Sequence, residues 1–325
     1  AALEMAAILA DVQPGDEVIM PSYTFVSTAN AFVLRGGMPV FVDIRNDTLN
    51  INESLIERAI TSRTKAIVPV HLYGLAPDLD TIQNISEDYK LKIVHDAAEA
   101  LGTKYKDKHT SSYKDVGIHS FFPNKVITTG EGGLITTNNL KFFNKIKEQR
   151  SHGIIRNLPK HWKYKINETS LNYRLSEINC ILGISQLKKI NSFLKKRFLL
   201  SKIYRKNFYS IKNLIEPIYT ENSSLSAWHL YIVFINFNKL KINKDKFIQR
   251  LKNDKIIVQQ HYIPLYKVLN MKGKMHKSFP NSERYFKNAL SLPLFNDLSF
   301  EKQKYVINKI KKILDYAKIK KRTKK

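Results

Sequence analysis

The chain has 325 residues, enough for one large and one smaller domain, and its hydrophobic fraction of 43% is sufficient for a buried core. The composition excludes a membrane-spanning helix, because no run of eighteen apolar residues occurs, and intrachain disulfides, because Cys180 is the only cysteine. We expect a cytoplasmic protein without a signal peptide, since the first residues lack a basic segment.

The first half of the chain alternates short apolar segments, rich in β-branched residues, with helical patterns. It begins inside a helical pattern, so we expect an N-terminally truncated piece of a longer protein. The pattern then predicts helices at 52–60 and 79–90 and strands at 17–21, 39–44, 66–71, 92–96, 117–122 and 133–137. Such alternation is typical of an α/β fold with a mostly parallel sheet covered by helices on both faces.

The middle of the chain is predicted to be mainly helical. A helix is expected at 138–152, an irregular stretch at 153–170 and a long helical region at 174–210. Cys180 lies in an apolar part of this region, so we expect it to be a buried structural thiol.

A change of composition at 215–230 predicts a domain boundary. We expect a large domain over 1–218 and a smaller α+β domain over 219–317. The second domain is predicted to contain strands at 228–237 and 256–266 and helices at 244–254, 282–290 and 300–314.

The net charge of +26 is unevenly distributed, because residues 1–150 carry 16 basic and 18 acidic residues and the others carry 38 and 10. A partner with phosphates, such as nucleic acid, an anionic membrane or a nucleotide sugar, would explain the basic half. A lysine-rich bias on solvated helices also explains it, and we favour this because the lysines are scattered. The tail at 318–325 is predicted to be disordered.

Two predicted strands end near residues of opposite charge. Asp96 closes the strand at 92–96, and Lys125 lies between the strand at 117–122 and a glycine-rich turn. Ligands of parallel sheets bind at the carboxyl ends of strands. A lysine that forms a Schiff base and an aspartate that keeps a pyridine nitrogen protonated are what pyridoxal 5'-phosphate (PLP) chemistry requires. Taken alone, Asp96 is equally well explained as a helix N-cap.

Six sequence blocks, in order, resemble the DegT/StrS-type sugar aminotransferases, a branch of the fold-type I PLP enzymes. The resemblance extends from residue 1 to about residue 315, and the blocks lie at 14–31, 39–44, 67–74, 95–102, 121–133 and 171–187. It implies PLP as the cofactor, a sheet sandwiched by helices with a smaller C-terminal domain, and a homodimer with shared active sites.

The resemblance assigns roles to individual residues. It makes Lys125 the Schiff-base lysine that also moves a proton, and Asp96 the partner of the pyridine nitrogen. Ser120 matches a serine that binds the cofactor phosphate. Asn172 and Arg174 match a block that reaches across the dimer interface toward the phosphate, with Arg174 also a substrate candidate. A helix cap near Ser176 is the alternative explanation for that block.

Two other cofactor positions are less clear from the residues alone. Glu99 stands where the family usually has Gln or His, which donate a hydrogen bond to the ring's phenolate oxygen. An ionised glutamate would repel that oxygen, so this departure bears on the tuning of the cofactor. Phe25, with Tyr23 as the second candidate, would stack on the cofactor face, although a core aromatic is an equally good explanation.

Substrate contacts are expected from residues at other strand ends and in the small domain. His71 and Tyr73 follow the strand at 66–71, and His229 and His261 match family blocks near the substrate entrance. A structural histidine is at least as good an explanation for His71. No spacing of Cys and His predicts a metal site.

The resemblance implies amino transfer, from glutamate, to carbon 4 of a nucleotide-linked 4-keto-6-deoxy sugar, for surface polysaccharides such as lipopolysaccharide. The second half is most similar to UDP-4-amino-4,6-dideoxy-N-acetyl-β-L-altrosamine transaminases of the pseudaminic acid route. The first half is equally similar to dTDP-4-amino-4,6-dideoxygalactose transaminases, and we favour the UDP-sugar. Lys125 favours transamination over related dehydratases, which have histidine there.

Two alternatives stay open at this point. One is a PLP-binding dehydratase or regulator of the same fold. The other is a non-catalytic protein whose basic half binds nucleic acid or anionic lipid. Because the Asp96–Lys125 pair is intact, we expect a nucleotide sugar and glutamate as partners and no nucleic acid.

Overall fold

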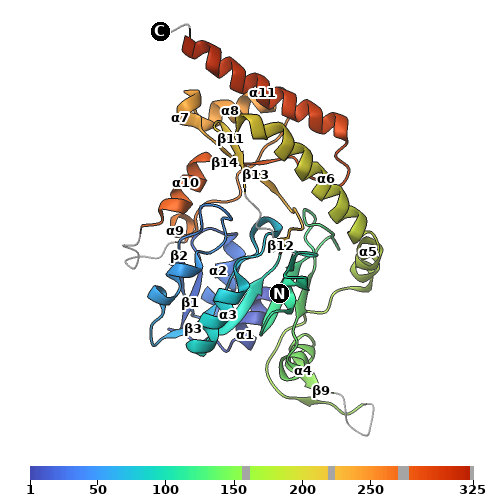
Figure 1. Cartoon of the computed structure of the whole chain (residues 1–325). Helices are drawn as coiled ribbons and strands as arrows, with labels where there is room; N and C mark the ends of the chain where they lie inside the picture. The colour runs from blue at the N-terminus through green and yellow to red at the C-terminus, as the bar shows by residue number, and fades with distance from the viewer. Residues whose placement is uncertain (156–161, 219–223, 270–277, 323–325) are drawn as a thin grey trace.

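A computed structural model describes residues 1–155, 162–218, 224–269 and 278–322. Figure 1 shows a larger unit built around a central sheet and, above it, a smaller unit whose outer side carries the long helices α6 and α11. The predicted helix at 138–152 is present as α4 (Leu140–Gln149), which extends from the larger unit together with the short strand β9 (Ile154–Ile155).

The larger unit contains a six-stranded sheet with the strand order β2-β1-β3-β4-β7-β8. Neighbouring strands are parallel except β7 and β8, which are antiparallel. The strands span Glu17–Pro21 (β1), Met38–Val42 (β2), Thr64–Ile67 (β3), Lys92–Asp96 (β4), Val116–Ser120 (β7) and Gly133–Thr136 (β8). All six predicted strands are therefore present, and the predicted fold class is confirmed.

Helices cover both faces of this sheet because both faces of its strands are apolar. Val18 and Met20 of β1 pack on the side of α1 (Ala2–Leu9) and α2 (Val26–Val33). Ile19 points to the opposite side, where it packs in one cluster with residues of α3 (Leu79–Asp88). Alternate residues of a strand point to opposite faces, so a continuous apolar strand needs a helical layer on each side.

The helix predicted at 52–60 is wrong in detail. The structure has two separate 3₁₀ turns, η1 (Glu53–Leu55) and η2 (Glu57–Ala59). The Glu53 side chain is buried and accepts a hydrogen bond from Arg45 at 2.5 Å, which fixes the first turn against the preceding loop. The other short elements are η3 (Leu72–Gly74), β5 (Lys104–Tyr105), β6 (Lys108–His109), η4 (Thr110–Ser112), β10 (Lys165–Ile166), η5 (Tyr209–Ile211) and β12 (Ser224–Leu225).

The predicted helical region at 174–210 forms two helices, α5 (Glu177–Leu187) and α6 (Ile190–Phe208). None of the residues of α5 is buried, and the Cys180 side chain is exposed. The prediction of a buried thiol is therefore wrong, because this apolar helix lies on the surface of the chain rather than in its core.

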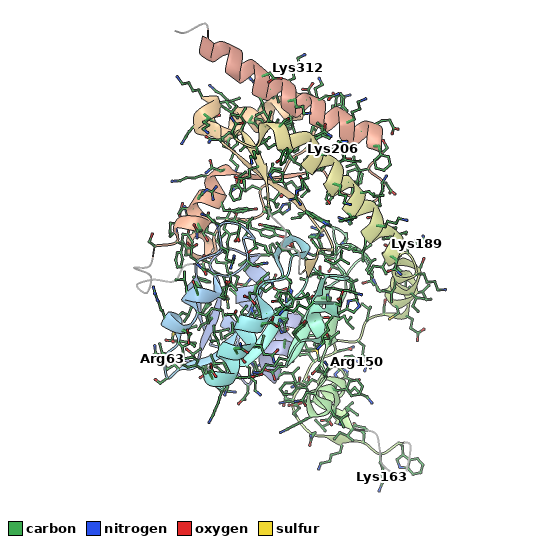
Figure 2. The ribbon with its side chains drawn as sticks, in the orientation of Figure 1. Arg63, Arg150, Lys163, Lys189, Lys206 and Lys312 are labelled. Carbon is green, nitrogen blue, oxygen red and sulfur yellow. The ribbon has the colours of Figure 1, made fainter. Side chains whose placement is uncertain are left out.

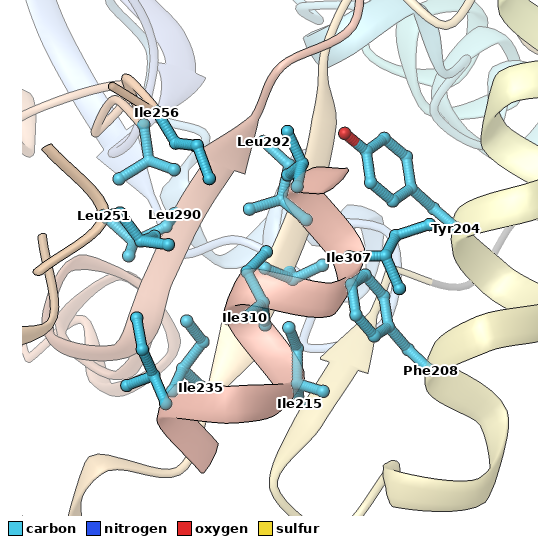
Figure 3. Close-up of a cluster of buried hydrophobic side chains, with 14 of the residues drawn as sticks. Tyr204, Phe208, Ile215, Ile235, Leu251, Ile256, Leu290, Leu292, Ile307 and Ile310 are labelled. Atoms are coloured by element: carbon cyan, nitrogen blue, oxygen red, sulfur yellow. The ribbon is translucent and has the colours of Figure 1, made fainter. Parts of the chain in front are cut away.

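The smaller unit has an antiparallel sheet with the order β11-β13-β14. In chain order from residue 215, the elements are β11 (Ile215–Pro217), β13 (Tyr231–Ile235), α7 (Phe237–Leu240), α8 (Lys244–Asn253), α9 (Leu265–Val268), α10 (Pro280–Asn288), β14 (Ala289–Leu292) and α11 (Phe300–Arg322). Figure 3 shows its core, in which Tyr204 and Phe208 of α6 pack beside Ile307 and Ile310 of α11. Because the end of α6 belongs to this core, we propose a boundary between the units within α6, earlier than residue 218.

Two predictions for the smaller unit are corrected. The segment 256–266 is not a strand and makes only an isolated bridge, between Gln259 and Ser291. Beyond Gln259 the segment turns to the larger unit, where the Leu265 amide donates to the Ser22 carbonyl at 2.9 Å, and Pro264 has no amide with which to continue a strand. In addition, α11 continues through Arg322 into the segment predicted to be disordered, while 323–325 lie outside the described residues.

Basic side chains are spread over the helices of the smaller unit rather than collected at one point. Figure 2 labels Lys189, Lys206 and Lys312 along this part of the molecule. The sequence of α6 contains six basic residues and no acidic residue. Among the described residues, no helix is both long and apolar enough to cross a membrane.

Candidate active site

Asp96 ends β4 at the carboxyl edge of the sheet, and its backbone is fixed from both sides. Its amide donates to the Pro69 carbonyl at 3.0 Å, and the His71 amide donates to its carbonyl at 2.9 Å. Its carboxylate accepts from the Thr28 hydroxyl at 2.6 Å and from the Ala98 amide at 3.1 Å. Burial raises the pKa of Asp96 above its ordinary value, against the lowering effect of these hydrogen bonds.

Lys125 lies in the loop that joins β7 to β8. Backbone hydrogen bonds close this loop, from the Phe121 amide to the Gly132 carbonyl and from the Thr129 amide to the Phe121 carbonyl. The glycine-rich turn is required here, because Gly130 has a φ of +78° and a Cβ at Gly132 would collide with Thr129. The loop holds the Lys125 side chain 14% exposed, with Nζ 3.3 Å from Glu99 Oε1.

Glu99 lies just beyond β4, and its buried carboxylate is the centre of a hydrogen-bond group. It accepts from the Tyr73 amide at 2.8 Å and from the Tyr262 hydroxyl at 2.5 Å, and His229 Nε2 lies 3.5 Å away. Burial would raise the pKa of Glu99, but His229, Lys125 and these donors outweigh it and lower the pKa to about 2. Glu99 is therefore ionised at neutral pH.

An exposed aromatic ring stands beside this group. Phe25 precedes α2, is 53% exposed, and has its ring centre 5.4 Å from that of Tyr262. Tyr23, the second candidate for this role, is instead fully buried and donates to the Tyr262 carbonyl. Ser120 ends β7, where its hydroxyl accepts from the Phe122 amide at 3.3 Å. The structure thus leaves the Phe25 ring, not the Tyr23 ring, free to contact a ligand.

Four other predicted residues make hydrogen bonds with groups other than Lys125. His71 is completely buried, with Nε2 3.3 Å from Nδ1 of His95, so its side chain is not open to a substrate. His261 Nδ1 lies 2.7 Å from the Ser291 hydroxyl. Asn172 and Arg174 are exposed and make local hydrogen bonds, Asn172 to the Arg174 amide and Arg174 to Ser151.

Comparison with known proteins shows which family this arrangement belongs to. The sequence profile of the DegT/DnrJ/EryC1/StrS aminotransferase family matches residues 1–311. The chain belongs to this family. It is therefore an aminotransferase, and PLP is the cofactor on which aminotransferases of the DegT/DnrJ/EryC1/StrS family depend.

Individual relatives are similar over nearly the whole chain. The protein MJ1066 of Methanocaldococcus jannaschii, whose function is uncharacterized, is 40% identical over 97% of this chain and 83% of its own length. A UDP-4-amino-4,6-dideoxy-N-acetyl-β-L-altrosamine transaminase of Campylobacter jejuni is 34% identical over 93% of this chain and 80% of its own.

A solved structure shows the same similarity. Helicobacter pylori PseC, an aminotransferase involved in the biosynthesis of pseudoaminic acid, superposes with a TM-score of 0.88 at 28% identity, covering 97% of this chain and 85% of PseC.

The residues present fit the cofactor of the DegT/DnrJ/EryC1/StrS family. Asp96 is a buried carboxylate that accepts hydrogen bonds from Thr28 and Ala98. Among the described residues, no lysine, arginine or histidine lies within ion-pair distance of it. A protonated ring nitrogen would supply the missing positive charge. Lys125 offers an amine, and Phe25 offers an uncovered apolar ring.

Two residues that bond the acidic groups of this site received no role from the sequence. Thr28 bonds Asp96 from 68 positions away in the sequence, and Tyr262 bonds Glu99 from 163 positions away. Thr28 has no motif of its own that marks it. Tyr262 lies beside His261 in a block that resembles the family near the substrate entrance, but the sequence does not show that its hydroxyl reaches Glu99.

Proposed function

We propose that this enzyme transfers an amino group, with glutamate as the donor, to carbon 4 of a nucleotide-linked 4-keto-6-deoxy sugar used for surface glycans. The observation that carries the proposal is the Lys125 amine held 3.3 Å from Glu99, just beyond the strand whose carboxyl end bears the buried carboxyl of Asp96. We favour a UDP-sugar, supported by the similarity to the Campylobacter jejuni transaminase. Both proposed substrates are cytoplasmic metabolites, so we expect the enzyme to act there.

The residues divide the work of the reaction between them. PLP, when bound, supplies the electron sink for the carbon that gains or loses the amine. Asp96 would hold the ring nitrogen protonated by ion pairing, and Thr28 fixes the orientation of its carboxylate. Lys125 Nζ would hold the cofactor covalently and, once released, carry a proton to and from the reacting carbon. Phe25 would keep water from one face of the ring.

We further propose that two chains build each active site, as the exposed apolar face of α5 supports. Ile178, Ile181 and Ile184 are 82%, 68% and 58% exposed, which is unusual for isoleucines of one helix. On its inner side, α5 contacts the Lys125 loop, because the Asn179 amide group donates to the Thr129 carbonyl. A second copy covering this face would bring Asn172 and Arg174, which precede α5, near the partner's site.

Absorbance spectroscopy tests the proposed function. The protein mixed with PLP should show a visible band of lysine-bound cofactor, and glutamate should move the absorbance toward the near-ultraviolet. Lys125→Ala should remove the visible band, whereas Lys252→Ala, at an exposed position on α8, should retain it. A panel of UDP-, GDP- and dTDP-linked 4-keto-6-deoxy sugars should then restore the visible band, most rapidly with the UDP-sugar. An identical band in both variants would contradict the assignment of Lys125.

A further inference from the structure

Polar groups from four different parts of the chain converge on the Glu99 carboxylate. Tyr73 follows β3, Lys125 lies in the β7–β8 loop, His229 precedes β13, and Tyr262 belongs to the segment between α8 and α9. The Glu99 side chain is only 7% exposed, so water contributes little to its surroundings. Such a convergence on one carboxylate fixes its position far better than a single hydrogen bond would.

The titratable groups around Glu99 differ in how burial shifts their pKa values. Burial lowers the pKa of His229 to about 3, against the raising effect of the neighbouring Glu99 carboxylate. His261, further out, also has its pKa lowered by burial, and burial together with Glu99 raises the pKa of Tyr262, which stays a phenol. Asp96 is the nearby acid, and its pKa is raised by burial. The negative charge of Glu99 therefore faces Lys125 as the nearest amine.

Tyr262, which donates to Glu99, is itself held firmly. The Tyr262 carbonyl accepts a hydrogen bond from the Tyr23 hydroxyl. The neighbouring His261 carbonyl accepts from the Tyr73 hydroxyl at 2.6 Å and from the Tyr285 hydroxyl at 2.8 Å. Three buried tyrosines thus fix the backbone from which Tyr262 reaches the carboxylate.

We propose that Glu99 is a positioning residue that holds the Lys125 nitrogen in place and keeps a proton on it after PLP is attached, with Tyr262 fixing Glu99. This inference rests on the proposed function, because it requires PLP bound at Lys125. The physical reason is that a fixed negative charge within hydrogen-bond reach of a nitrogen stabilises its protonated form. Glu99 thereby sets the pH range in which the lysine-bound cofactor carries its proton.

The test is a pH titration of the visible absorbance of the PLP-bound enzyme. In Glu99→Gln, which keeps the side-chain shape but removes the charge, the midpoint of the absorbance change should fall by about one to three pH units. Glu99→Asp keeps the charge but, because its side chain is shorter, places the charge farther from Lys125 Nζ. Its midpoint should therefore lie between those of Glu99→Gln and the wild type.

Glu283 supplies a matched control, because it also accepts from a tyrosine and a lysine, Tyr266 at 2.8 Å and Lys267 at 3.0 Å, away from Lys125. Glu283→Gln should leave the midpoint unchanged. A folded Glu99→Gln that loses the visible band, while Glu283→Gln retains it, would support the positioning of the amine. A Glu99→Gln band with the wild-type midpoint overturns the inference. Absence of the band from the wild-type protein would instead refute the proposed function.

Discussion

Asp96 is the side chain on which the proposed chemistry depends most directly. Asp96→Asn can still accept a hydrogen bond from the Ala98 amide and donate one to the Thr28 hydroxyl, but it loses the charge that would keep the ring nitrogen protonated. We expect the variant to fold normally and amino transfer to fall by about two orders of magnitude or more. Single-turnover absorbance changes after glutamate addition measure this, with circular dichroism as the check on folding. Wild-type rates in the variant would contradict the assignment.

Buried histidines make the stability of the protein depend on pH. Burial lowers the pKa of His95 and of His119 to about 4, whereas a histidine in an unfolded chain titrates near 6.5. Between these values the unfolded chain binds protons that the folded protein does not. Stability that is present above pH 6.5 is therefore lost as the pH falls toward 4, at about 1.4 kcal/mol per histidine per pH unit.

Urea denaturation from pH 7 to pH 4.5 measures this loss. His119→Gln should reduce the slope of unfolding free energy against pH, even if it lowers stability at pH 7. His152→Asn, at an exposed position, is the control and should retain the wild-type slope. A slope that is identical in all three proteins would show that these histidines do not cause the acid sensitivity.

The strand pattern of the sequence is sufficient to predict which site residues lie at strand ends. It is insufficient to predict which other residues contact those site residues in the folded protein. Asp96 and Lys125 follow directly from the strand pattern, because parallel strands bring their carboxyl ends to one edge. Thr28 and Tyr262 meet their acidic partners only after distant segments pack together. The departure at Glu99 was visible in the sequence, but its ionised state depends on the burial and donors that folding supplies.

At the level of elements, α5 carries the clearest prediction. Ile181→Asp places a charge on its exposed apolar face, so the proposed dimer should dissociate and the sedimentation coefficient should fall to that of a monomer. Ile257→Asp is the matched control, because Ile257 is similarly exposed, at 71% against 68%, but lies in the smaller unit. Unchanged sedimentation of Ile181→Asp would rule out α5 as the interface.

Elements were predicted well where the apolar pattern was continuous and poorly where single residues decided the outcome. Strands β1 to β4 of the main sheet were found because both of their faces are apolar. The pattern at 52–60 predicted one helix, but the segment forms two 3₁₀ turns, and the buried Glu53 side chain in the first turn is held by Arg45. Cys180 looked buried because a surface helix with an apolar outer face cannot be distinguished by its sequence from a core helix.

At the scale of the whole molecule, the Arg197 side chain joins α6 to the segment before β13 and to the segment after β14. Its buried guanidinium donates to the carbonyls of Trp228, His229 and Leu294 at 3.0, 3.1 and 3.3 Å and to Asn296 at 3.0 Å. Arg197→Met leaves these acceptors unpaired and should lower the free energy of unfolding by about 3 kcal/mol or more. Arg205→Met, on an exposed position of the same helix, should change it by less than about 0.5 kcal/mol. Chemical denaturation followed by circular dichroism distinguishes the two.

The exposed position of Cys180 makes the molecule easy to label. Because the sequence has one cysteine, a maleimide dye would attach at a single site, on the helix whose outer face we expect to meet a second copy. The rate of labelling should then decrease as the protein concentration rises, since association shields the thiol. One sulfhydryl thus provides a reporter of assembly that requires no engineered residue.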